Sequence, residues 1–210
     1  MLLSGIAMLL ALQVQQPRRG VGFLRTSYFL PGAIGFAAAS LLFYGFYSDN
    51  GPLDSILMDL GIVDEPVAWL GTPNAALFST IAMVIWRFAG FNMLILLTGL
   101  QAIPTEVYEA ARSDGANRWQ MFRHITLPLL RPTIALMLVL SITGSLLAFD
   151  QFFILTRGGP ENGTVSMVMV IYREAFTRFD LGGAAGISVL LLLVLVALNI
   201  IQLRVLGRER

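Results

Sequence analysis

Long apolar stretches alternate with short polar segments along this chain. Five stretches approach the roughly 20 apolar residues that a transmembrane helix needs. They run from Met1 to about Gln13, Tyr28 to Tyr47, Ala75 to Gly99, Thr133 to Leu155 and Gly183 to Leu206. The first is short, and basic residues follow it rather than precede it, which favours part of a transmembrane helix over a signal peptide. The pattern predicts an all-α membrane protein with about five transmembrane helices.

Composition supports this prediction and excludes several kinds of functional site. Of the 210 residues, 56% are hydrophobic and 13% are charged, whereas a soluble domain carries roughly 25% charge. The absence of cysteine excludes disulfides, thiolate metal sites and cysteine nucleophiles. The single histidine, His124, leaves little room for imidazole chemistry.

The placement of arginine predicts the orientation of the spans. All 14 basic residues are arginine, and most of them follow the first, third and last spans. They are Arg18, Arg19 and Arg25; Arg112, Arg118, Arg123 and Arg131; and Arg204, Arg208 and Arg210. The loop from Tyr47 to Ala75 has no arginine and carries five acidic residues. By the positive-inside rule, that loop is outside and the C-terminus is cytoplasmic.

Two segments are predicted to lie at the outer surface. Leu53 to Ile62 is a short apolar segment between two turn signals, and we expect it at the membrane interface. Met167 to Asp180 places Tyr172, Phe176 and Phe179 at helical spacing among charged residues. This second pattern predicts an amphipathic helix that lies flat on the membrane.

A polar segment with short helical patterns follows the third span. Pro104 can start a short helix by fixing its first turn, and Gly115 permits a turn out of it. Trp119 and Phe122 then form one apolar face of a second short helix, which Pro128 is expected to end. The simplest alternative is an ordinary loop along the lipid headgroups, with arginines that serve only topology.

The spacing within this segment resembles a known signature. Glu109-Ala110-Ala111 is followed after three residues by Gly115 and, nine residues later, by Ile125-Thr126-Leu127-Pro128. This EAA motif is similar to the loop of permease subunits in binding-protein-dependent ABC importers. Five sequence words match the carbohydrate branch, the maltose and glycerol-phosphate permeases, in order: GLQAIP at 99–104, YEAA at 108–111, LPLLRP at 127–132, LTRGGP at 155–160 and YREAF at 172–176. The resemblance covers the chain from about Arg25 to the C-terminus.

The resemblance implies a type I importer bundle and a division of the chain. Residues 1–27 are expected to hold a partial transmembrane helix and a basic cytoplasmic loop, and residues 28–210 the importer transmembrane domain. Within it, residues from about 101 to 131 form the cytoplasmic coupling loop. Members of this family usually have another transmembrane helix before the first one seen here. Its absence indicates a misplaced start codon, a fragment or a variant with a reduced bundle, and it puts assembly in doubt more than coupling.

The first short helix is, by the same resemblance, the coupling helix that seats in a cleft of a cytoplasmic ATPase. Glu109 is expected to face a basic group there, Ala110 and Ala111 to allow close approach, and Gly115 to supply the bend. Asp114 is a further ATPase-coupling candidate. The chain has no Gly-x-x-x-x-Gly-Lys-Ser/Thr phosphate loop. We therefore expect it to be no enzyme and to bind no cofactor, with ATP and magnesium on the partner ATPase.

Polar residues inside the spans are candidates for the substrate path. A mid-membrane arginine is costly and usually faces a cavity or a partner, which makes Arg87 notable. The resemblance points to Phe91 and Asn92 in the third span and to Asp150 and Gln151 in the fourth. Amides and carboxylates can bond sugar hydroxyls while aromatic rings cover C–H surfaces. The alternatives are helix–helix hydrogen bonding and a structural ion pair between Arg87 and Asp150.

These observations together predict the membrane-spanning subunit of an ATP-driven importer in the bacterial inner membrane. It would pass a sugar or a sugar-like polyol phosphate inward from an external binding protein. The expected partners are a second homologous permease, an ATPase dimer, that binding protein and the lipid bilayer, with no nucleic acid. The alternative is an ion-coupled secondary transporter, although Asp150 is the only convincing carboxylate within a span and inverted repeats are not evident.

Overall fold

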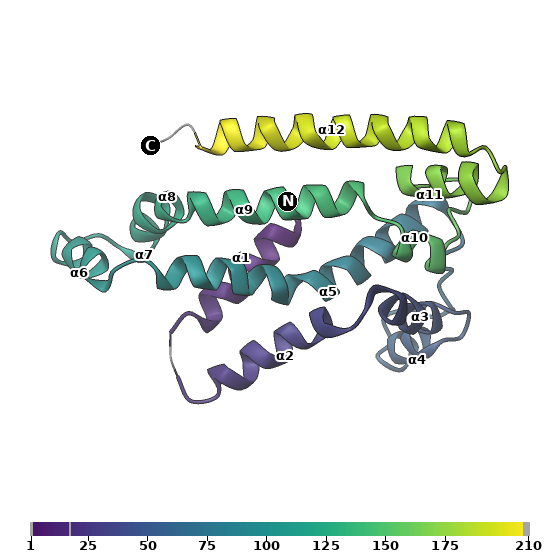
Figure 1. The fold of residues 1–210 in the computed structure, drawn as a ribbon. Coiled ribbons are helices and arrows are strands. Elements are labelled where there is room, and N and C mark those ends of the chain that lie inside the picture. The colour runs from purple at the N-terminus through teal and green to yellow at the C-terminus, as the bar shows by residue number, and fades with distance from the viewer. Residues whose placement is uncertain (1, 17, 208–210) are drawn as a thin grey trace. The chain divides into compact units, whose positions relative to one another are not determined.

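The computed structural model describes residues 2–16 and 18–207, with side chains as far as Arg204. Met1, Arg208 and Arg210, which entered the sequence argument, lie outside these ranges. Every regular element in the described part of the chain is a helix, as predicted (Figure 1). The elements are α1 (Leu2–Val14), α2 (Val21–Ala33), α3 (Phe36–Phe46), α4 (Pro52–Asp59), α5 (Pro73–Gln101), α6 (Thr105–Ser113), α7 (Arg118–Met121), π-helix η1 (Phe122–Thr126), α8 (Leu127–Leu129), α9 (Arg131–Leu146), α10 (Asp150–Leu155), α11 (Met167–Tyr172), π-helix η2 (Arg173–Thr177) and α12 (Leu181–Gly207).

The predicted spans differ in continuity. Helices α5 and α12 are each long and apolar enough to cross a membrane, and up to four crossings result if each bent helix pair counts as one. The predicted continuous helix from Tyr28 to Tyr47 is wrong, because it breaks between α2 and α3. The predicted helix from Thr133 to Leu155 is also interrupted, since α9 ends at Leu146 and α10 begins at Asp150. The first predicted span is a 13-residue helix, α1, which is shorter than a full crossing requires.

The break between α2 and α3 has a local cause in the sequence. Pro31 lies inside α2, where it removes one backbone hydrogen bond and its ring crowds the preceding turn. Gly35 then takes an extended conformation and is the N-cap of α3. Hydrophobicity alone cannot reveal such a break, because the apolar run continues through it.

The chain forms two compact units, each assembled from separated segments. The first contains the described residues of Met1–Gly32, Phe88–Ile142 and Ala197–Arg210, and the second those of Ala33–Arg87 and Thr143–Val196. The predicted division at residue 27 follows family resemblance rather than compactness, and it stays a prediction.

The core of the first unit packs α1 against the second half of α5 and the start of α9. Ala7 and Ala11 lie one helical turn apart on α1 and are fully buried. Small side chains at this spacing let helices approach closely. The larger members of this core are Met93, Leu96, Leu100, Leu130 and Met137.

Gly90 marks a second close approach in the first unit. A Cβ atom at this position of α5 would overlap the Tyr28 carbonyl of α2 and come within 2.9 Å of the Phe29 Cα. The two helices can therefore meet at this depth only because residue 90 has no side chain.

The second unit includes a well-anchored loop. Its core contains Tyr47, whose hydroxyl donates to the Ser79 carbonyl at 3.0 Å. The predicted short apolar segment forms α4, and its Asp54 side chain is fully buried. The Asp54 carboxylate accepts hydrogen bonds from the Val67 amide at 3.2 Å and from the Trp69 indole at 2.8 Å. These bonds fix the end of the loop beside α4.

Candidate functional site

The candidate coupling loop forms the helix that its sequence predicts. Helix α6 begins after Pro104, which is its N-cap, and ends at its C-cap, Asp114. Glu106 lies in its first turn and Arg112 in its last turn, so both charges match the helix dipole. Gly115 has φ +79°, the left-handed conformation that glycine adopts at lowest cost after a helix. The predicted short helix and glycine turn are therefore confirmed.

The predicted coupling residues lie on an accessible surface of the first unit. Glu109, Ala110, Asp114 and Gly115 are exposed, Ala111 is half-buried, and α6 has no buried residue. The small side chains of the two alanines let a partner approach this helix closely, and the neighbouring carboxylate offers it a charge. The structure describes this surface without a partner, so the role of each residue remains a prediction.

The second short helix is longer than expected. A capping box begins it, since the Gln120 amide donates to Asn117 Oδ1 at 2.9 Å and the Asn117 amide donates to Gln120 Oε1 at 2.8 Å. The pattern Asn-x-x-Gln could have revealed this start. The helical path continues through η1 and α8 and ends at Leu129, one residue after the predicted end at Pro128. The π-helix bonds Leu127 to Phe122, and Pro128 falls in the first turn of α8, where a missing N–H is tolerated.

The predicted apolar face of this helix is present, and much of it is exposed. The Trp119 and Phe122 rings lie 5.8 Å apart by their centroids. Trp119 is exposed and Phe122 is half-buried. Both residues line a hollow of about 1610 Å³ between α6, the end of α5 and α1, all within the first unit. Glu109 and Arg112 line the same hollow, so the candidate coupling surface is concave and carries both charges.

A hydrogen bond that the sequence did not reveal joins the two short helices. The Tyr108 hydroxyl of α6 and the Thr126 hydroxyl of η1 lie 3.0 Å apart. Thr126 is buried, and the Tyr108 ring packs against the core of the first unit. Tyr108 directly precedes Glu109, so this bond ties the exposed coupling surface to the base of α9.

Arg87 has a structural partner at the helix break. Its Nε donates to the Ile34 carbonyl at 2.9 Å, and its guanidinium carbon lies 4.0 Å from the Phe36 ring centroid. The Ile34 carbonyl follows the end of α2, where carbonyls lack helical partners, and cation–π contact adds to the attraction. Arg87 therefore bridges the gap between α2 and α3. Its alternative pairing with Asp150 stays a prediction.

The other candidate path residues have different environments. Asn92 is buried in the first unit, donates to the Phe88 carbonyl at 3.0 Å and accepts from Ser141 Oγ at 3.4 Å. Its neighbour Phe91 is exposed. In the second unit, Asp150 is exposed at the start of α10, whereas Gln151 is buried. Phe91 and Asp150 thus have accessible side chains, and the Asn92 amide takes part in packing α5 with α9.

Comparison with known proteins identifies the family. The profile described as "Binding-protein-dependent transport system inner membrane component" matches residues 4–209. The chain belongs to this family. It is an inner-membrane permease of an ABC importer, so it is a transport subunit, and ATP hydrolysis takes place on a separate ATPase.

Individual relatives align with nearly all of this chain. It is 35% identical to the lactose transport system permease protein LacF of Rhizobium radiobacter, over 98% of this chain and 70% of LacF. It is 36% identical to the sn-glycerol-3-phosphate transport system permease protein UgpA of Agrobacterium fabrum, over 95% of this chain and 68% of UgpA. A solved bacterial alginate ABC transporter, in complex with an alginate-bound periplasmic protein, matches with a TM-score of 0.83 and 27% identity, over 95% of this chain and 73% of that chain. The all-α permease fold predicted from sequence is confirmed.

Proposed function

We propose that this permease passes a sugar or a sugar-like polyol phosphate from an external binding protein into the cytoplasm. The names of its relatives support this substrate class, since they include a lactose permease and an sn-glycerol-3-phosphate permease. The alginate transporter that it resembles also carries a carbohydrate. The common chemistry of these solutes is a dense set of hydroxyl groups.

The proposed assembly contains a second homologous permease, two ATPase subunits and the external binding protein. ATP and magnesium bind the ATPase subunits. The C-terminus lies in the cytoplasm with α6, because arginines follow both α5 and α12. The family description and the periplasmic protein in the alginate complex support the binding-protein partner.

The observation that carries the coupling proposal is the exposure of α6. Glu109 and Ala110 are exposed, Ala111 is half-buried, and Glu109 lines the hollow that Trp119 also lines. Closure of the ATPase dimer around ATP pulls α6, and the Tyr108–Thr126 hydrogen bond passes that movement to η1 and α9. Transport then follows from different solute affinities in the two conformations, with no catalytic residue in this chain.

For the substrate path, we propose that Phe91 and Asp150 contact the solute directly. Both side chains are exposed within their own units, and aromatic rings and carboxylates are groups that bind sugars. Arg87, Asn92 and Gln151 shape the path, because Arg87 and Asn92 already hold backbone carbonyls and Gln151 is buried.

Co-purification from native membranes tests the proposal. The wild-type permease should bring down an ATPase subunit and a second permease, and Glu109→Lys should release the ATPase or abolish stimulation of its activity by the binding protein. Glu161→Lys is the matched control, because it reverses an exposed charge in the loop before α11. The coupling proposal is wrong if the two variants behave alike, or if the wild type purifies without any ATPase.

A further inference from the structure

Three large apolar side chains stand exposed where η2 passes into α12. Phe176 is 66% exposed, Phe179 is 81% exposed and Leu181 is 70% exposed. We call these three residues the aromatic tip. All belong to the second unit, and their exposure within six consecutive residues requires an explanation, because water is a poor solvent for such a group.

The backbone of the aromatic tip is strained at Phe179, whose side chain is exposed. Phe179 has φ +56°, a left-handed conformation that a bulky L-residue rarely adopts and that glycine usually occupies after a helix. Strain of this kind persists where the surroundings fix the backbone, and it is commonly linked to function. Phenylalanine at this position has more backbone strain than glycine would have, and its ring is exposed.

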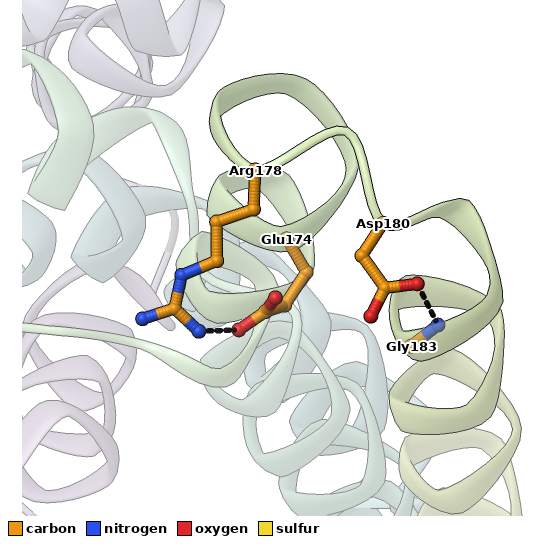
Figure 2. A network of polar contacts seen from close by, with 4 residues as sticks. All are labelled: Glu174, Arg178, Asp180 and Gly183. Carbon is orange, nitrogen blue, oxygen red and sulfur yellow. Dashed lines mark hydrogen bonds and ion pairs between the residues drawn. The ribbon is translucent and has the colours of Figure 1, made fainter.

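Hydrogen bonds on both sides fix this turn (Figure 2). On one side, the Asp180 amide donates to the Glu174 carbonyl at 2.9 Å, and Arg178 Nη1 lies 2.6 Å from Glu174 Oε1. On the other side, Asp180 Oδ1 accepts from the Gly183 amide at 2.9 Å and so caps the first turn of α12. The turn therefore holds the tip in one orientation at the start of the helix.

The length of α12 places the tip at a bilayer surface. The apolar helix from Leu181 to Arg204 has 24 residues, which span about 36 Å at 1.5 Å per residue. A hydrocarbon core is about 30 Å thick, so a centred helix leaves its first residues at the edge of the core. Phe176 and Phe179 precede that edge, at the depth where aromatic side chains are enriched in membrane proteins.

The charged neighbours fit the same depth. The Arg178 side chain is 71% exposed beside the tip, although it pairs with Glu174. A guanidinium at this level can reach lipid phosphate oxygens while its apolar stem stays near the rings. The charged neighbours of the tip are of both signs, because Glu174 and Asp180 lie in the same turn as Arg178. Exposed apolar side chains beside charged ones are the composition expected at the headgroup level of a bilayer.

We propose that the aromatic tip inserts into the outer lipid interface and anchors the start of α12, with phospholipid as its occupant. Anchoring would fix the external end of α12 during the transport cycle. The inference rests on the proposed orientation, with α12 crossing the membrane and its C-terminus in the cytoplasm, and goes beyond the proposed function because it depends on neither the solute nor the coupling loop.

A single spin label tests this position. The chain has no cysteine, so Phe179→Cys introduces one labelling site in this subunit, and the unmodified permease gives the background from its partners. Glu161→Cys is the matched control, because Glu161 is also exposed and left-handed, with φ +53°. The labelled transporter is reconstituted in vesicles of phosphatidylethanolamine and phosphatidylglycerol, and collision rates with oxygen and with a water-soluble nickel chelate are measured.

The proposal predicts that the ratio of oxygen to nickel collisions is several-fold higher at position 179 than at position 161, with or without the binding protein. Equal ratios would place the tip in water and overturn the proposal. Shielding from both reagents at 179 would mean that a protein covers the tip: a permease partner if the shielding is constant, or the binding protein if it appears only on docking. Phe179→Gly controls for folding, since it removes the ring and relieves the backbone; it should retain thermal stability in detergent.

Discussion

Replacement of Gly90 by alanine tests the close packing of α2 against α5. The new Cβ would overlap the Tyr28 carbonyl and approach the Phe29 Cα within 2.9 Å. Both are backbone atoms, so no rotamer change can relieve the clash. Overpacking costs about 1–3 kcal/mol, and we expect the upper end here. Alanine regains about 1 kcal/mol of helix propensity, which leaves a net loss of about 2 kcal/mol.

Thermal unfolding of the purified permease in detergent, followed by circular dichroism, measures this loss. For a chain of this size, 1 kcal/mol corresponds to roughly 2–4 °C, so Gly90→Ala should lower Tm by roughly 4–8 °C. Gly144→Ala is the matched control: Gly144 lies in α9, and a Cβ there meets no atom within 4 Å. Its Tm should stay the same or rise slightly. If both variants unfold at the wild-type temperature, α2 and α5 do not meet at Gly90.

Three further substitutions probe the loops. Tyr108→Phe removes the bond to buried Thr126 and leaves the Thr126 hydroxyl unsatisfied, which costs about 1–3 kcal/mol of stability. The variant should reduce transport per ATP hydrolysed while the ATPase still co-purifies. Wild-type coupling would show that the bond transmits no movement. Asp54→Ala removes the acceptor of the Trp69 indole and should cost about 2 kcal/mol in denaturant unfolding, whereas Asp54→Asn should cost less; equal losses would contradict the hydrogen-bond argument. Asn117→Ala removes the capping box and should cost about 1 kcal/mol, seen as faster amide exchange in α7; unchanged exchange would mean that the cap does not hold this helix.

The elements that could be predicted from sequence are those with local causes. Pro104 and Gly115 start and end α6 through their own backbone preferences, and both positions are as predicted. The length and hydrophobicity of α5 and α12 identify them without any tertiary information. These features need no partner elsewhere in the chain.

The features that could not be predicted depend on distant residues. The break between α2 and α3 has local signals in Pro31 and Gly35. The bond that stabilises it does not, because Arg87 holds the Ile34 carbonyl across 53 positions. The same contact gives this intramembrane arginine a structural role that composition could not separate from a cavity role. Tyr108 and Thr126 are 18 positions apart and lie on different helices, so their hydrogen bond has no local signal in the sequence.

The two parts of the candidate site, the coupling loop and the substrate path, differ in the same way. The spacing from Glu109 to Gly115 predicted the short helix and the turn of the candidate coupling loop, because both have local causes. The substrate path is harder to predict, because it depends on which faces of whole helices lie opposite one another. Asn92 illustrates the difference, since its amide is buried between α5 and α9 rather than exposed beside Phe91.

The most direct test of the central claim is solute uptake by proteoliposomes that contain the complete transporter and its binding protein. Uptake of a radiolabelled sugar or polyol phosphate should require ATP on the side where α6 is exposed. It should stop with Glu109→Lys and continue when an uncoupler dissipates ion gradients. Uptake that survives without ATP and collapses with the uncoupler would contradict the account and indicate an ion-driven transporter.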